Sequence, residues 1–137
     1  MTKMNGQMTT TKRWENEKRK FRPGDVVIVE LPFRQKPGSK TRPAVVVSSE
    51  YHNQARQDLV VVSVSSQPVA GPWDLNIEHW REAGLKIPSK VVSDQIMTVF
   101  QDKLKLVGHI DPETLAEIKV KVALILELCS DCDELDG

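Results

Sequence analysis

Hydrophobic residues in the first half of the chain gather in short β-branched runs separated by polar segments. Residues 26–31 read VVIVEL after an RPGD turn signal, residues 43–48 read PAVVVS, and residues 59–64 read LVVVSV. Valine-rich runs of this length are typical of strands with at least one buried face. The intervening segments, 33–42 and 49–58, are polar and carry no helical period, so we expect long loops and antiparallel pairing rather than β-α-β units.

The second half of the chain predicts two more strands and a helix. Alternation at 75–78 and the run near 90–93 predict a fourth and a fifth strand, while 98–104 is expected to form a short helical turn. The DPE sequence at 111–113 is a strong helix start, and apolar residues then recur at helical spacing to about Leu128. We therefore expect a mainly β (α+β) fold, a bent antiparallel sheet of about five strands covered by a C-terminal α-helix.

Length and charge restrict the domain organisation and the class of partner. The 137 residues, 39% hydrophobic and 28% charged, suit one globular domain and are too few for two of ordinary size. We expect a flexible tail at 1–20, the domain at 21–129 and an acidic tail at 130–137. Lys plus Arg and Asp plus Glu number 19 each. This balance argues against binding duplex DNA mainly through phosphate neutralisation, but it allows an RNA groove with a few local cations.

Membrane, metal and redox roles find little support in the sequence. No apolar run approaches the roughly 20 residues that cross a bilayer, and no signal-peptide pattern follows the N-terminus, so we expect a cytoplasmic protein. Cys129 and Cys132 form a lone C-x-x-C without the second ligand pair that structural zinc requires. We expect no metal site and no cofactor.

Five sequence blocks stand in a fixed order over about residues 22–128. They read RPGDVVIVELPF, KTRPAVVVSSE, VVVSVSSQ, GLKIPSKVVSDQIMTV and GHIDPETLAEI. Together they resemble the PemK/MazF (Kid-like) toxins of type II toxin–antitoxin systems. The resemblance implies an SH3-like small barrel, a homodimer, metal-independent endoribonuclease activity on single-stranded RNA such as mRNA, and silencing by a cognate antitoxin protein.

The resemblance also implies which residues are catalytic. The arginine of the RPAVV block is Arg42, at the expected junction of loop and strand, and the hydroxyl residue that ends the third strand is Ser65. Most family members have threonine at the second position, and Ser66 is the alternative if the alignment shifts by one. Asp94 of the DQ pair either accepts a proton or orients Arg42, or else it only caps backbone at a strand end.

These residue types suit metal-free cleavage by the RNA's own 2′-OH, which gives a 2′,3′-cyclic phosphate and a 5′-OH. A guanidinium matches the phosphoryl oxygens with two parallel hydrogen bonds and stabilises the charge that develops there. A serine hydroxyl can donate to a phosphate oxygen but is a poor general base. The sequence does not identify that base.

RNA contacts are expected mainly in the loops at 33–42 and 65–74. Trp73 could stack on a splayed base or plug the barrel mouth. His109 precedes the last helix with no paired acid nearby in the sequence, which favours a positioning role. The candidate RNA-binding residues are Arg34, Lys36, Lys40, Ser66, Gln67, Trp73 and Gln95.

Two other functions compete with RNA cleavage. A toxin of the same fold could inhibit a protein target such as DNA gyrase without being an enzyme, and the acidic end SDCDELDG would suit a protein contact. A nucleic-acid-binding regulator is the third hypothesis. Zero net charge and the lack of a recognition-helix pattern make it the weakest.

Overall fold

Six strands form one antiparallel sheet in the order β4-β5-β3-β2-β1-β6. The computed structural model of the protein describes residues 21–33, 35–102 and 104–128. The predictions for the two tails, for Arg34 and for the cysteine pair lie outside these ranges. The strands are β1 (Asp25–Pro32), β2 (Ser39–Val46), β3 (Asp58–Ser65), β4 (Asp74–Asn76), β5 (Lys90–Phe100) and β6 (Lys105–His109), and the helices are α2 (Glu50–Ala55) and α3 (Pro112–Leu126).

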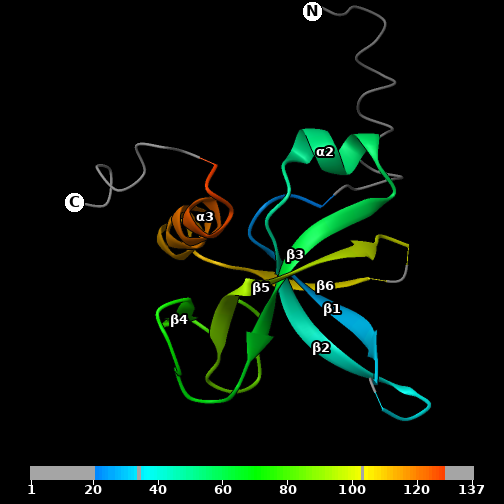
Figure 1. The fold of residues 1–137 in the computed structure, drawn as a ribbon, viewed down its shortest axis with the longest axis horizontal. Coiled ribbons are helices and arrows are strands. Elements are labelled where there is room, and N and C mark those ends of the chain that lie inside the picture. Colours follow the sequence, from blue (N-terminus) through cyan, green and yellow to red (C-terminus); the bar gives the residue numbers. More distant parts are fainter. Residues whose placement is uncertain (1–20, 34, 103, 129–137) are drawn as a thin grey trace, which may run out of the picture.

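The sheet is strongly curved, with α3 beside it and the β1–β2 hairpin projecting at the end away from α2 (Figure 1). Its outer strands, β4 and β6, are not paired with each other in the described part of the chain, so the sheet is not closed. The expected mainly β fold with a C-terminal helix is confirmed. The strand number is six rather than about five.

Three local predictions in the polar segments are wrong. The β1–β2 hairpin pairs as far as Pro32 and Ser39, so residues 39–42 belong to a strand and not to a long loop. Strand β5 continues to Phe100 against β3, where a helical turn was expected, and β6 follows it as an unpredicted strand. The segment 49–58 contains α2, which starts because the Ser49 side chain accepts a hydrogen bond from the backbone N–H of His52.

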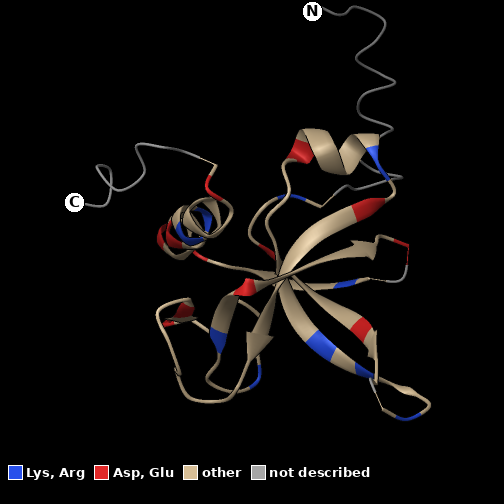
Figure 2. Ribbon diagram, in the orientation of Figure 1, with Lys and Arg blue, Asp and Glu red and all other residues tan. Residues whose placement is uncertain are grey.

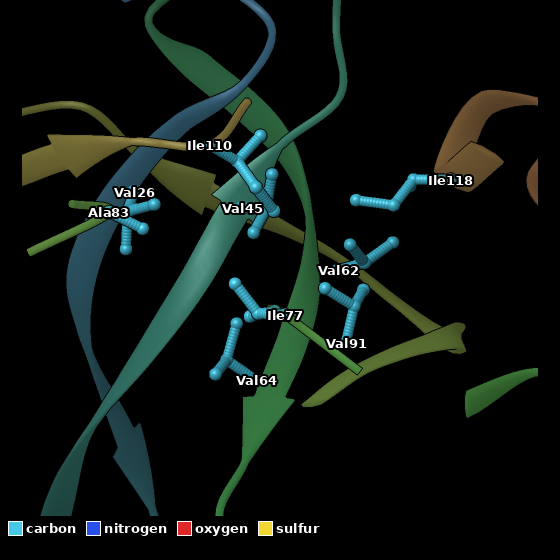
Figure 3. Close-up of a cluster of buried hydrophobic side chains, with 9 residues drawn as sticks. All are labelled: Val26, Val45, Val62, Val64, Ile77, Ala83, Val91, Ile110 and Ile118. Atoms are coloured by element: carbon cyan, nitrogen blue, oxygen red, sulfur yellow. The ribbon is translucent and has the colours of Figure 1, made fainter. Parts of the chain in front are cut away.

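The central strands are buried on both faces, which explains their nearly continuous valine runs. Neighbouring residues such as Val26 and Val27 belong to different hydrophobic clusters. The first cluster, drawn in Figure 3, joins the sheet to α3 and to the segment around Ile77 and Ala83. The second consists of Val27, Val29, Ala44, Val46, Leu59 and Val61.

Helix α3 begins as the sequence predicts. Asp111 caps it by accepting the backbone N–H of Thr114 at 3.0 Å, and Pro112 is its first residue. Ile118, fully buried, packs on the first cluster near Val62 and Val91 (Figure 3). Neither α2 nor α3 has the length and apolar character that a bilayer-spanning helix would need.

Candidate active site

A pocket of about 450 Å³ opens at one end of the sheet, beside the segment 84–89. Three of its lining residues are basic, namely Arg42, Lys86 and Lys105, and none is Asp or Glu. Such a lining favours an anionic ligand. The remaining lining residues are Ile28, Thr41, Pro43, Val64, Ser65, Ser66, Gly84, Leu85, Ile87, Ser89 and Val107.

Arg42 and Ser65, the two predicted catalytic residues, line this same pocket. Arg42 is exposed and lies within β2, opposite Val29 of β1, rather than at a junction of loop and strand. The β2–β3 pairing includes Ala44 opposite Ser63. Arg42 and Ser65 each lie two residues beyond this last pair, and side chains two residues apart on a strand project from the same face.

The Ser65 hydroxyl is held by the backbone of the residue after next. Its Oγ accepts the backbone N–H of Gln67 at 3.1 Å. A hydroxyl that accepts one hydrogen bond keeps its own O–H as a donor. The side chain is therefore restrained on one side and available to donate on the other.

Two further cavities differ from this pocket in character. A pocket of about 370 Å³ adjoins the first through Ser66 and Ser89 and includes Gln67. A groove of about 690 Å³ between α3 and β4 carries carboxylates and no Lys or Arg, which suits an RNA backbone poorly. Figure 2 shows basic residues on β2, whereas α3 carries both acidic and basic residues. The carboxylates of the groove are Asp74, Glu78, Asp111, Glu113 and Glu117.

A buried ion pair lies beside the Ser65 end of β3. Lys90 stands opposite Ser65 in the β3–β5 register, and its Nζ donates to Asp74 Oδ2 at 2.5 Å. Both side chains are nearly inaccessible, at 7% and 9% exposed. The hydrogen bond from Lys90, helped by one from the Ala70 backbone, lowers the pKa of the Asp74 carboxyl below its ordinary value, because both favour the charged form.

We predict an acid-labile contribution of this pair to stability. Because the pKa of Asp74 is lower in the folded than in the unfolded chain, the stabilisation is complete above the ordinary carboxyl pKa of about 4 and is lost as the pH falls through the folded value. Urea unfolding between pH 7 and pH 2 should show a steeper acid loss of unfolding free energy for the wild type than for the double variant K90M/D74L, which leaves neither charge buried alone. Parallel curves for the two proteins would contradict this assignment.

Asp94 and Gln95 do not join the pocket. Strand β5 is irregular between Val92 and Ile96, which pair with consecutive residues of β3, so both side chains lie in the irregular stretch. They are exposed, and neither lines the pocket of Arg42. No ion pair or hydrogen bond joins Asp94 to Arg42, both of which are described. The structure thus does not bring the tentative catalytic aspartate to the other two residues.

The remaining RNA-contact candidates are spread around the pocket. Lys36 and Lys40 are exposed on the β1–β2 hairpin, and the Lys36 ammonium lies 4.6 Å from the centre of the Phe33 ring. Lys40 is two residues from Arg42 and so shares its face of β2. Trp73 is half-buried and does not line the pocket, and its carbonyl accepts the backbone N–H of Ser93.

His109 has an acidic partner that sequence reasoning missed. Its Nδ1 lies 2.8 Å from Oδ1 of Asp25, a buried carboxylate that also accepts the backbone N–H of Arg22. The expectation that no acid pairs with His109 is therefore wrong. The pair joins the start of β1 to the end of β6, and neither residue lines the pocket of Arg42.

Lys86, Lys105 and Thr41 are pocket residues that the sequence did not single out. Lys105 belongs to β6, a strand that was not predicted, and Lys86 lies in a turn. The only signal that the two lysines carry in the sequence is positive charge, which many exposed residues of this chain share. Within the described ranges, no group of three or more His, Cys, Asp or Glu side chains is arranged to hold a metal ion.

Comparisons with known proteins bear on the whole described domain. A family model, described as PemK-like, MazF-like toxin of type II toxin-antitoxin system, matches residues 22–126. A MazE-MazF crystal structure (Form-III) from Deinococcus radiodurans is similar with a TM-score of 0.65 and 18% identity, over 78% of this chain and 96% of that chain. An endoribonuclease in complex with its cognate antitoxin, from a mycobacterial species, gives a TM-score of 0.60 and 21% identity, over 80% and 97%. Comparison with curated protein sequences gives no match. At these identities the structural likeness concerns the fold.

Proposed function

The chain belongs to the PemK-like, MazF-like toxins of type II toxin-antitoxin systems, and from this we propose that it is an endoribonuclease that cleaves single-stranded RNA without a metal ion. The observation that carries the proposal is the pocket in which Arg42 and Ser65 lie together with Lys86 and Lys105 and without a carboxylate. A pocket with this lining can bind a phosphodiester and stabilise extra negative charge on it.

In the proposed reaction the RNA supplies its own nucleophile. The 2′-oxygen forms a bond to the adjacent phosphorus while the bond from phosphorus to the 5′-oxygen breaks. The 2′-OH loses its proton and the leaving 5′-oxygen gains one, so the products are a 2′,3′-cyclic phosphate and a 5′-OH. Arg42 binds the phosphoryl oxygens as their charge rises, the Ser65 hydroxyl donates to one of them, and the two lysines hold the phosphate chain.

We further propose two protein partners. A second copy of the chain would form a homodimer. The outer edges of β4 and β6, which have no partner strand within the described residues, are available for it. A cognate antitoxin would inhibit by laying an extended segment over the RNA groove. One similar structure is of an endoribonuclease bound to its cognate antitoxin, which supports this arrangement for the present chain.

Cleavage of a long single-stranded transcript in EDTA tests the proposal. We expect defined cuts whose products carry a 2′,3′-cyclic phosphate and a 5′-OH, and we expect Ser65→Ala to slow cutting by about 10-fold to 100-fold through loss of a donor to the phosphate. Cutting rates should be measured on end-labelled RNA, with cut sites mapped by primer extension.

Two results would contradict it. Cleavage that requires added Mg²⁺ and survives Ser65→Ala would refute the mechanism. No cleavage of any RNA, together with retention of purified DNA gyrase by the immobilised protein, would favour the non-enzymatic alternative.

A further inference from the structure

The loop at 66–73, which follows Ser65, is fixed by contacts to three different elements. Lys90 Nζ on β5 donates to the Pro68 carbonyl at 2.7 Å, and Lys121 Nζ on α3 donates to the Pro72 carbonyl at 3.0 Å. The side chain of Asp74, at the start of β4, accepts the Ala70 N–H at 2.8 Å. A segment with this many partners has little freedom to move.

We propose that Lys90 and Asp74 are positioning residues that fix the orientation of the Ser65 hydroxyl through this loop. The inference rests on the proposed function, because it gives Ser65 a donor role toward RNA. It adds two residues that do not line the pocket of Arg42.

The connection runs through three consecutive contacts. The ion pair holds the loop at two points: Lys90 of β5 donates to the Pro68 carbonyl, and Asp74 of β4 accepts the Ala70 N–H. Pro68 directly follows Gln67 and its ring fixes its own φ, so holding its carbonyl restricts the path of the chain on the C-terminal side of Gln67. The Gln67 N–H then donates to Ser65 Oγ and selects one side-chain orientation.

A serine needs such an external restraint more than a β-branched residue does. Val, Ile and Thr carry two heavy atoms on Cβ, which restrict χ1, whereas serine rotates among three staggered positions. A hydroxyl that turns away from the phosphate loses its hydrogen bond in the transition state. Misplacement of a reacting or supporting group by about 1 Å can cost about 100-fold in rate.

The burial of the pair supports a positional use. Removing two charges from water carries a large penalty, and apolar residues of similar size are often as stabilising as a buried ion pair. The side chains of Lys90 and Asp74 are nearly inaccessible, in a sheet whose buried residues are mostly apolar. The pair provides directed hydrogen bonds to the loop backbone, which an apolar pair cannot provide.

The test uses a double variant, because a single substitution would leave one buried charge unpaired and could unfold the protein. K90M/D74L replaces both charges with apolar groups of similar size. It is compared with wild type, with S65T, with the triple variant K90M/D74L/S65T, and with Lys119→Met as a control on the exposed face of α3. Thermal unfolding of each full chain establishes that it is folded.

Three results are expected. In K90M/D74L, hydrogen exchange of the Gln67 amide accelerates, and kcat for RNA cleavage in EDTA falls about 10-fold to 100-fold while KM changes little. In the double-variant background, S65T restores most of the lost kcat, because the threonine methyl restricts χ1. Lys119→Met behaves as wild type.

Opposite results separate the inference from the proposed function. Unchanged kcat in a folded K90M/D74L, or a loss that S65T fails to rescue, overturns the positioning role while RNA cleavage by the wild type stands. An unchanged hydrogen-exchange rate of the Gln67 amide in K90M/D74L also overturns the positioning role. A wild type that cuts no RNA refutes the proposed function and the positioning role with it, whereas accelerated exchange at Gln67 would still identify the pair as the restraint on the loop.

Discussion

Replacing Arg42 with alanine is expected to reduce RNA cleavage in EDTA by about 100-fold to 1000-fold, the range found when one preorganised donor to a developing oxyanion is removed. Arg42 lines the same pocket as Ser65, and only a guanidinium offers two parallel donors to a phosphoryl group. Its side chain is exposed at the sheet end, so the melting temperature should stay within about 2 °C of wild type.

Arg56→Ala is the matched control for this prediction. Arg56 is also exposed, but it follows α2 at the other end of β3, away from the pocket. The Arg56→Ala variant should cleave RNA as the wild type does. This result would distinguish loss of the Arg42 guanidinium at the pocket from a general loss of positive charge. Initial rates at saturating and at limiting RNA divide the effect of Arg42→Ala between kcat and KM. A variant that keeps more than about a tenth of the wild-type rate would contradict a direct role in the transition state.

Gly84→Ala is expected to destabilise the fold by at least about 1–3 kcal/mol, the usual cost of forcing atoms into a packed site. Gly84 has a φ of +88°, which side chains rarely adopt, and a Cβ there would lie 2.1 Å from the carbonyl oxygen of Val107. On the other side of this contact, a Cβ on Gly108 would lie 2.1 Å from the Ala83 carbonyl oxygen. The two backbones touch, so no side-chain movement can relieve the clash.

Gly71→Ala provides the corresponding control. A Cβ on Gly71 meets nothing within 4 Å, and its φ lies outside the range that favours glycine. We expect it to be neutral or to stabilise by up to about 1 kcal/mol through a less flexible unfolded chain. Urea unfolding of the three proteins measures both effects. Equal midpoints for Gly84→Ala and Gly71→Ala would show that the close backbone approach does not limit the fold.

The elements that the sequence predicts are those whose local pattern agrees with their tertiary surroundings. β1 and β3 follow from uninterrupted valine runs, and α3 follows from its aspartate cap and its proline. β6 was missed because its five residues, KLVGH, lie at a sheet edge and are mostly exposed or half-buried, so they carry no clean alternation. The polar start of β2 was missed for a similar reason, since residues 39–42 form a strand only by pairing with β1.

The candidate site was predictable only in part. Arg42 and Ser65 were identified through a family resemblance, and the structure sets them at one pocket. Lys105 reaches that pocket only because β6 pairs with β1, which is a long-range contact that no local pattern encodes. The buried partners Lys90 and Asp74 are likewise 16 residues apart and met through strand pairing.

The close backbone contact of Gly84 with Val107 and Gly108 lies at the pocket, since Gly84 and Val107 both line it. Peptide groups present the same donors and acceptors whatever the sequence, so point substitutions can hardly reshape this contact without breaking the domain. Selection for a different target sequence would therefore act on exposed side chains of the β1–β2 hairpin and on Ile87. With a fixed backbone contact beside exchangeable surface side chains, the choice of substrate can evolve while the proposed cleavage chemistry stays constant.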